Sequence, residues 1–299
     1  MIAGRPRVEH PLCRGSSPRL GVQRLHDEDP ATNEGKMTSD TEIHYLASGV
    51  LPKILDRGRI RVGITTFYPW AMPDRDGKWI GYNIDIATQL AEDMGVDLEF
   101  VPAAYEELNT ALKNDRFDVM IAGTSTTTWR NLEVNITTPY VRHSVSIVTS
   151  RKLEGVIEAT EDLNKSDVVV LRSGLEGANT AKRLYPRAQD TLIKDDAQCF
   201  QAILDGTAHA FHCIAPKASL IMLQYPDLFY VPPALHPIVI QQAGISVRKG
   251  DPDILNYLDN WLLQHRSDGW LEARWHYWSE TTKWFDRVEN NPYVLGGDP

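Results

Sequence analysis

Residues 59–64 read RIRVGI, and this alternation of polar and apolar side chains is typical of a half-buried β-strand. A helix is predicted from Ile84 to Met94, because apolar residues recur there at helical spacing and Gly95 ends the pattern. Further strands are predicted at 98–101, 119–122, 168–171 and 210–213, with helices at 105–112, 177–184 and 197–204. Two such runs of alternating strands and helices predict two α/β lobes with largely parallel sheets.

The order of the elements also predicts how the chain is divided. Residues 145–149 and 239–247 are strand-like connections between the two runs, so the chain is expected to cross twice between lobes. Lobe 1 is therefore predicted at residues 52–145 plus 245–288, and lobe 2 at 146–244. Residues 1–51 are predicted to be an extension, whose first 36 residues are disordered because they follow no helix or strand period. Residues 289–299 are predicted to be a C-terminal tail.

Composition excludes several classes of protein. The 299 residues include 31 Lys+Arg and 40 Asp+Glu, giving a formal net charge of −9, so a nucleic-acid-binding surface is not expected. The sequence contains no apolar run of the roughly 18–20 residues that a membrane span requires. The basic start is not followed by the apolar run of about 7–15 residues that marks an export signal. Cys199 and Cys213 are expected to be unpaired buried thiols, with a disulfide in an oxidising compartment as the alternative.

Several blocks along the chain resemble bacterial extracellular solute-binding proteins of family 3. They are FYPW (67–70), GKWIGYNIDI (77–86), FDVMIAGTSTTTWR (117–130), TPY (138–140), LDG (204–206), GISVRKGD (244–251) and DGW (268–270). The blocks occur in the family's order over about residues 52–288. The resemblance implies a two-lobed periplasmic-binding-protein-like (type II) fold with a ligand cleft between the lobes. It also implies a periplasmic monomer that closes on a small polar ligand and delivers it to the permease of an ABC transporter.

The loop after the strand at 119–122 supplies the candidate ligand contacts of lobe 1, which are Gly123, Ser125, Thr127 and Arg130. Arginine binds a carboxylate through two parallel hydrogen bonds, and hydroxyl and backbone donors can complete such a site. The alternative is a helix start at which Thr127 or Thr128 acts as a cap and Arg130 is solvated. The aromatic candidates for the wall of the site are Tyr68 and Trp70, with core packing as the alternative for each.

Lobe 2 departs from the family pattern where an amino-acid ammonium would bind. Ile214 occupies the position of the usual Asp, and Leu175 that of a common Thr. An ammonium buried there without a counter-charge would cost several kcal/mol. Either Glu176 replaces the missing acid, or the ligand has no ammonium. Alternatively, the negative charge of Glu176 stabilises the N-terminus of the helix that follows it.

Ser173 and His212 complete the candidate contacts of lobe 2. His209 and His212 lie three apart on a strand and point to opposite faces, so no metal site is predicted, and no cofactor.

The sequence thus predicts a solute-binding protein for a small polar, anionic ligand, either an amino acid or an organic acid, and not an enzyme. The alternative on the same fold is a cyclohexadienyl (arogenate/prephenate) dehydratase, whose catalytic Glu lies in the second-lobe loop. The matching position here is Gly177, and Glu176 falls one residue early. A general acid must lie within hydrogen-bond reach of the leaving group, which disfavours the enzyme. A sensor module that presents its ligand state to a partner protein is a third class.

Overall fold

The first of the two large β-sheets has the strand order β4-β1-β5-β13-β6 in the computed structural model, which describes residues 49–172 and 177–295. Its strands are β1 (Arg59–Ile64), β4 (Asp97–Pro102), β5 (Val119–Met120), β6 (Asn135–Ile136) and β13 (Ser246–Val247). β1 is parallel to both β4 and β5, whereas β13 is antiparallel to β5. The predicted alternation in β1 is confirmed, because Ile60, Val62 and Ile64 are all buried.

Helices cover this sheet and complete lobe 1, together with a small hairpin. The elements are α2 (Val50–Arg57), β2 (Met72–Pro73), β3 (Trp79–Ile80), α3 (Tyr82–Met94), η1 (Tyr105–Glu107), α4 (Leu108–Lys113), α5 (Arg130–Glu133), α10 (Pro252–Ser267), α11 (Trp270–Ser279) and η4 (Phe285–Arg287). α3 ends where predicted, because Gly95 adopts φ +66 and its N–H bonds back to the last turn. The single helix predicted at 105–112 is instead a 3₁₀ turn followed by α4.

The second sheet forms lobe 2 and has the order β11-β7-β10-β8-β9, with β12 paired to β7. Its strands are β7 (Val141–Ser150), β8 (Val169–Arg172), β9 (Gln189–Leu192), β10 (Ala210–Ile214), β11 (Phe229–Tyr230) and β12 (Val239–Ala243). Its helices are η2 (Arg151–Leu153), α6 (Thr160–Leu163), α7 (Gly177–Leu184), α8 (Asp196–Leu204), α9 (Ala215–Gln224) and η3 (Pro233–Leu235). β8 is parallel to both β9 and β10, as strand–helix alternation predicts.

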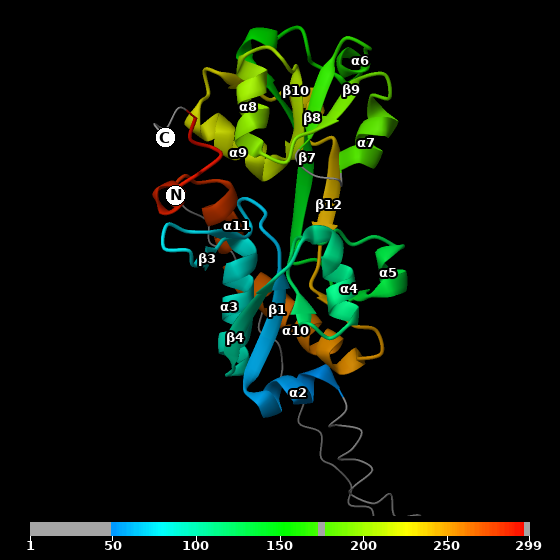
Figure 1. Cartoon of the computed structure of the whole chain (residues 1–299), viewed down its shortest axis with the longest axis vertical. Coiled ribbons are helices and arrows are strands. Elements are labelled where there is room, and N and C mark those ends of the chain that lie inside the picture. The colour runs from blue at the N-terminus through cyan, green and yellow to red at the C-terminus, as the bar shows by residue number, and fades with distance from the viewer. Residues whose placement is uncertain (1–48, 173–176, 296–299) are drawn as a thin grey trace, which may run out of the picture.

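Two antiparallel strands connect the lobes. β7 and β12 pair from Val141 with Ala243 to Val145 with Val239. Figure 1 shows both strands running from one lobe to the other. The predicted two-lobed α/β fold is confirmed, while the residue boundaries given above for the lobes stay a prediction.

The end of the chain returns to lobe 2. Tyr293 is buried and its ring centroid lies 6.1 Å from that of Phe200 in α8. The hydroxyl of Tyr225, just after α9, donates to the carbonyl of Leu295 at 3.1 Å and accepts from its N–H at 2.7 Å. The described part of the predicted tail, residues 289–295, therefore packs against the second lobe (Figure 1).

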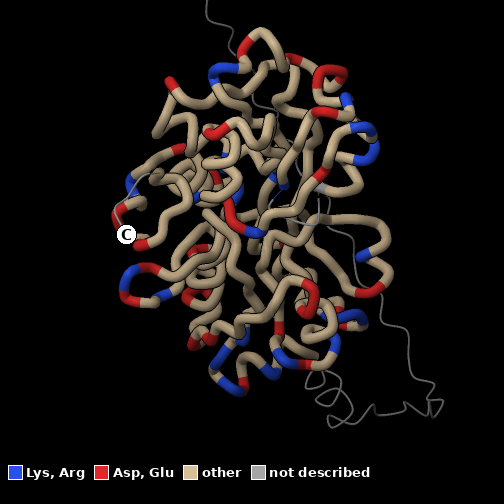
Figure 2. The backbone as a smooth tube through the Cα atoms, turned by 45° about the horizontal axis from the view of Figure 1, so that its top comes forward, with Lys and Arg blue, Asp and Glu red and all other residues tan. Residues whose placement is uncertain are grey.

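The outer surface carries charges of both signs. Figure 2 shows Lys and Arg interspersed with Asp and Glu over both lobes in the part of the chain that is drawn as a tube. Across residues 49–172 and 177–295, no helix has the length and apolar character needed to cross a membrane.

Candidate functional site

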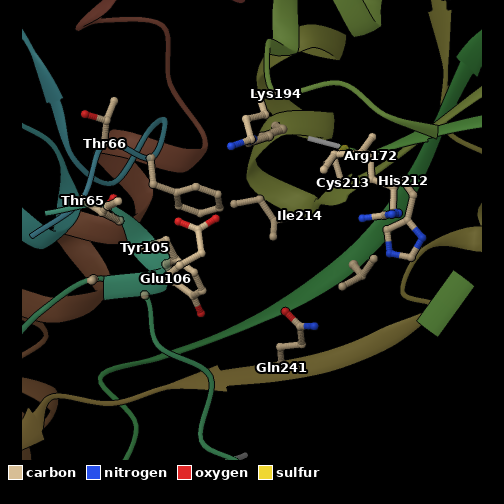
Figure 3. A pocket seen from close by; sticks show the side chains of 17 residues that line it. Thr65, Thr66, Tyr105, Glu106, Arg172, Lys194, His212, Cys213, Ile214 and Gln241 are labelled. Carbon is tan, nitrogen blue, oxygen red and sulfur yellow. The ribbon is translucent and has the colours of Figure 1, made fainter. Parts of the chain in front are cut away.

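A cavity of about 360 Å³ lies between the two lobes. Segments that follow β1, β4 and β5 form its lobe 1 wall, and lobe 2 contributes the ends of β8, β9 and β10 together with α9. The connecting strands add Val145 from β7 and Gln241 from β12. Figure 3 shows side chains from both lobes extending toward the same space. A ligand in this cavity would therefore contact both lobes and the connection between them.

The lobe 1 wall follows from the parallel strands β1 and β5. Residues 65–67 come directly after β1 and residues 122–123 after β5, so both segments lie at the same sheet edge. Gly123 has φ +68, and a Cβ there would lie 2.5 Å from Cζ3 of Trp70. Only glycine fits this position, because both the backbone conformation and the close indole ring exclude a side chain.

The turn after β4 adds Tyr105 and Glu106 to the same wall. The Tyr105 hydroxyl accepts a hydrogen bond from Nη2 of Arg130 at 2.7 Å. Glu106 is exposed, and Figure 3 shows its carboxylate pointing into the space between the lobes. Among the described residues that line the cavity, Glu106 is the one carboxylate.

In lobe 2, Arg172 at the end of β8 lies beside His212 of β10 in the strand register. Both residues line the cavity, as does Ile214 at the end of β10. Nε of Arg172 donates to Oδ1 of Asp190 at 2.6 Å. The carboxylate of Asp190 therefore partly neutralises the positive charge of Arg172 at the cavity wall.

Lys217 of α9 forms a buried ion pair with Asp196 of α8. Its Nζ lies 2.7 Å from Oδ2 and 2.8 Å from Oδ1 of that carboxylate. The same ammonium lies 4.8 Å from the ring centroid of Phe67. Because Phe67 belongs to lobe 1 and Lys217 to lobe 2, this cation–π contact joins the lobes at the cavity.

His212 is buried in the lobe 2 wall, with 4% of its surface exposed. Burial, with a smaller contribution from Arg172, lowers the pKa of its imidazole to about 4, so the ring is neutral at pH 7. The Tyr185 hydroxyl is hydrogen-bonded to Nδ1 of His212. Within the described residues this hydroxyl has no other acceptor, so it donates to Nδ1 and the ring proton is assigned to Nε2. Nε2 has no partner among those residues.

The predicted loop at 123–130 lies only partly at the cavity. Gly123 lines it, whereas Ser125, Thr127 and Arg130 do not. The Arg130 guanidinium is instead buried within lobe 1, where Nη1 donates to the Ser125 carbonyl at 3.0 Å and Nη2 to Tyr105. The Thr127 hydroxyl accepts from the Arg130 N–H at 3.4 Å, while the Arg130 side chain is buried and not solvated. Anion binding by this loop stays a prediction.

The aromatic candidates lie behind the cavity rather than in its wall. Trp70 is 1% exposed and packs beneath Gly123, in contact with His143 and Trp275. Tyr68 is half-buried and does not line the cavity, whereas its neighbour Phe67 does. Its side chain points elsewhere because residues 67–71 form a tight turn closed by backbone hydrogen bonds.

The remaining residues of the predicted lobe 2 site either line the cavity or lie outside the part of the chain that the structure describes. His212 and Ile214 both line the cavity. The apolar side chain of Ile214 therefore lies in the cavity wall. Ser173, Leu175 and Glu176 lie outside the described residues, just before α7 begins at Gly177.

Sequence reasoning missed Tyr105, Glu106, Lys194 and Lys217. The available signal for the first three was their position just after the strands β4 and β9, where the carboxyl ends of parallel strands meet.

Cys213 lines the cavity, whereas Cys199 does not. Cys199 and Cys213 are free and buried, which confirms the favoured prediction, and burial raises the pKa of both thiols. In residues 49–172 and 177–295, no three His, Cys, Asp or Glu side chains are grouped so that they could hold a metal ion.

The family model for bacterial extracellular solute-binding proteins, family 3, matches residues 60–281. The chain belongs to this family. The L-cystine-binding protein TcyJ of Escherichia coli K12 is 26% identical over 238 residues, which are 78% of this chain and 87% of TcyJ. A cyclohexadienyl dehydratase of Pseudomonas aeruginosa is 28% identical over 235 residues, covering 75% of this chain and 87% of the enzyme.

Solved structures agree with this family and fold. The ancestral amino acid-binding protein AncCDT-1, a precursor of cyclohexadienyl dehydratase, matches with a TM-score of 0.68 and 31% identity. The match covers 78% of this chain and all of that protein. The relatives of this family-3 protein thus include both binding proteins and an enzyme.

Proposed function

We propose that this family-3 protein binds a small ligand that carries a carboxylate, either an amino acid or an organic acid, for uptake by an ABC transporter. The observation that supports this proposal best is the cavity between the carboxyl ends of two sheets, with walls from both lobes. Its volume of about 360 Å³ suits a small molecule. Closure of two lobes around a ligand is a hinge motion, and β7 and β12 are the strands about which it would occur.

The polar groups of the lobe 2 wall support a carboxylate in the ligand. Arg172, Lys194 and Lys217 all line the cavity, and Glu106 is the one carboxylate among the lining residues that the structure describes. His212 adds a neutral donor, since its ring proton is assigned to Nε2. We therefore propose His212 and the backbone of Gly123 as ligand contacts. Arg130 we propose as a positioning residue, because it holds the Tyr105 hydroxyl at the cavity wall.

The remaining proposals concern where and with whom the protein acts. Because the family is defined by extracellular solute-binding proteins, we propose that this chain acts outside the cytoplasmic membrane as a monomer. Its macromolecular partner would then be an ABC-transporter permease, which receives the ligand from the closed form.

A thermal-shift screen of amino acids, organic acids and polyamines tests the proposal. A ligand present at 100 times its dissociation constant adds about 2.7 kcal/mol to the free energy of unfolding. We expect at least one carboxylate-bearing compound to raise the melting temperature and the polyamines to leave it unchanged. A screen in which no amino acid or organic acid stabilises the protein would contradict the proposal.

The dehydratase is the second candidate, favoured by the 28% identity to a cyclohexadienyl dehydratase over 87% of that enzyme. Incubation with prephenate and arogenate, followed by chromatography for phenylpyruvate and phenylalanine, tests it. We expect no product. Product that forms with the natural chain and disappears in Glu176→Gln would replace the binding proposal with an enzymatic one. Glu106→Gln tests the other candidate for a catalytic acid, because Glu106 is the carboxylate among the described residues of the cavity wall.

A further inference from the structure

A segment near the end of the chain joins the two lobes a third time. Residues 282–295, called the strap below, leave lobe 1 after α11 and end against lobe 2. Figure 1 shows this segment in red at one side of the junction between the lobes, away from β7 and β12. The match to the family model ends at residue 281, so the strap lies outside the matched region. The proposed uptake function gives the strap no role.

The first half of the strap is anchored to lobe 1. Nε1 of Trp284 donates to the carbonyl of Trp278 in α11 at 3.2 Å, and the Trp284 side chain is fully buried. The N–H of Arg75, in the turn between β2 and β3, donates to the carbonyl of Arg287 at 2.9 Å. The strap also continues covalently from α11. This half of the strap therefore moves with lobe 1.

The second half of the strap is anchored to lobe 2. The ring of Tyr293 is fully buried, with its centroid 6.1 Å from that of Phe200 in α8. The same ring stacks on Phe285 of the strap at 5.9 Å. Leu295 exchanges two hydrogen bonds with the hydroxyl of Tyr225, at 3.1 and 2.7 Å. Tyr293 thus packs between lobe 2 and the half of the strap that belongs to lobe 1.

This arrangement opposes separation of the lobes. Rotation about β7 and β12 displaces most strongly the parts of the lobes that lie far from those strands. Because the strap joins both lobes away from β7 and β12, one of its ends must detach before the lobes separate. The lobe 1 end is covalently continuous with α11, whereas the packing of Tyr293 and the hydrogen bonds of Leu295 hold the lobe 2 end. The lobe 2 end is therefore the one that can be released.

We propose that the strap holds the lobes together in the ligand-free protein, and that opening requires Tyr293 and Leu295 to leave lobe 2. Contacts made only in the closed form raise its population, so their loss shifts the free protein toward the open form. For the proposed binding function, release of the strap would precede entry and exit of the ligand. That consequence rests on the proposed function, whereas the role of the strap in the free protein does not.

Small-angle X-ray scattering of the ligand-free full chain measures the separation of the lobes. Tyr225→Phe removes both hydrogen bonds to Leu295 and keeps the ring, and Tyr293→Ala removes the ring that packs between the lobes. We expect a larger radius of gyration in both variants than in the natural chain. Hydrogen exchange followed by mass spectrometry should show strap amides exchanging about ten-fold faster in Tyr225→Phe, the effect typical of losing two hydrogen bonds.

Two matched substitutions serve as controls. Tyr293→Phe keeps the packed ring and removes a hydroxyl that has no hydrogen-bond partner among the described residues, so it should scatter like the natural chain. Tyr230→Phe removes a lobe 2 hydroxyl that donates to Glu158 rather than to the strap, and it should leave both measurements unchanged. Melting temperatures show that each variant is folded. If Tyr293→Ala does not fold, Tyr225→Phe decides the test, because it retains every packed ring.

The outcomes distinguish a strap that holds the lobes from one that only packs on lobe 2. A radius of gyration in folded Tyr225→Phe and Tyr293→Ala equal to that of the natural chain would overturn the inference, even with faster exchange confined to the strap. Expansion of Tyr293→Phe to the same extent as Tyr293→Ala would also overturn it, because the ring contacts would then not be the cause. Neither measurement uses a ligand, so failure of this inference leaves the proposed function to its own thermal-shift test.

Discussion

Acidification should destabilise the protein through His212. The folded state holds the pKa of this imidazole at about 4, against an ordinary value of 6.5, mainly because the ring is buried beside the cavity. Arg172 also disfavours the protonated ring, whereas Asp190 favours it, and Tyr185 occupies Nδ1. Between these two pKa values the unfolded chain binds a proton at His212 that the folded chain does not.

The sign and size of the effect follow from linkage. Above pH 6.5 the ring is neutral in both states, so its full contribution to stability is present. That contribution is lost as the pH falls from 6.5 toward 4, at about 1.4 kcal/mol for each pH unit. Relative to pH 7, the free energy of unfolding should fall by about 2 kcal/mol at pH 5 and about 3 kcal/mol at pH 4 from this residue alone.

Urea unfolding of the natural chain and of His212→Gln at pH 7, 6, 5 and 4 measures this contribution. Glutamine does not titrate, so the difference in unfolding free energy between the two proteins should change by those amounts as the pH falls. His276→Gln removes an exposed histidine of α11 and should give the profile of the natural chain. Parallel stability profiles for the natural chain and His212→Gln would refute the reasoning, because they would show that His212 takes up its proton equally in both states.

Three further substitutions test other parts of the structure. Asp196→Asn leaves the Lys217 ammonium buried without its carboxylate, so chemical denaturation should show a loss of about 3–5 kcal/mol, and a loss below about 1 kcal/mol would contradict a buried pair. Gly123→Ala should cost about 1–3 kcal/mol in the same assay, because its Cβ meets Trp70 and φ is +68; combination with Trp70→Phe should recover part of the loss. Arg130→Ala should weaken ligand binding in calorimetry by loosening the cavity wall, and an unchanged affinity would remove its proposed positioning role.

Local patterns in the sequence determined the architecture. The alternation in RIRVGI and the helical spacing that ends at Gly95 predicted β1 and α3, because the burial of every second or every third to fourth side chain is a property of the segment itself. The two crossings between lobes followed from the order of the strands. The position of Ile214 in the cavity wall was also predictable, since it ends a strand whose neighbours end at the same edge.

The tertiary structure alone decided which side chains reach the ligand cavity. Tyr68 and Phe67 are adjacent aromatic residues, yet only Phe67 lines the cavity, because the backbone turn at 67–71 fixes the direction of each side chain. Arg130 was the natural candidate for a carboxylate partner, but Tyr105, from a segment 25 residues away in the chain, accepts its hydrogen bond. Glu106 and Lys194 face one cavity only because the fold brings two lobes together. Such contacts depend on distances between remote segments, and no local pattern of residues encodes those distances.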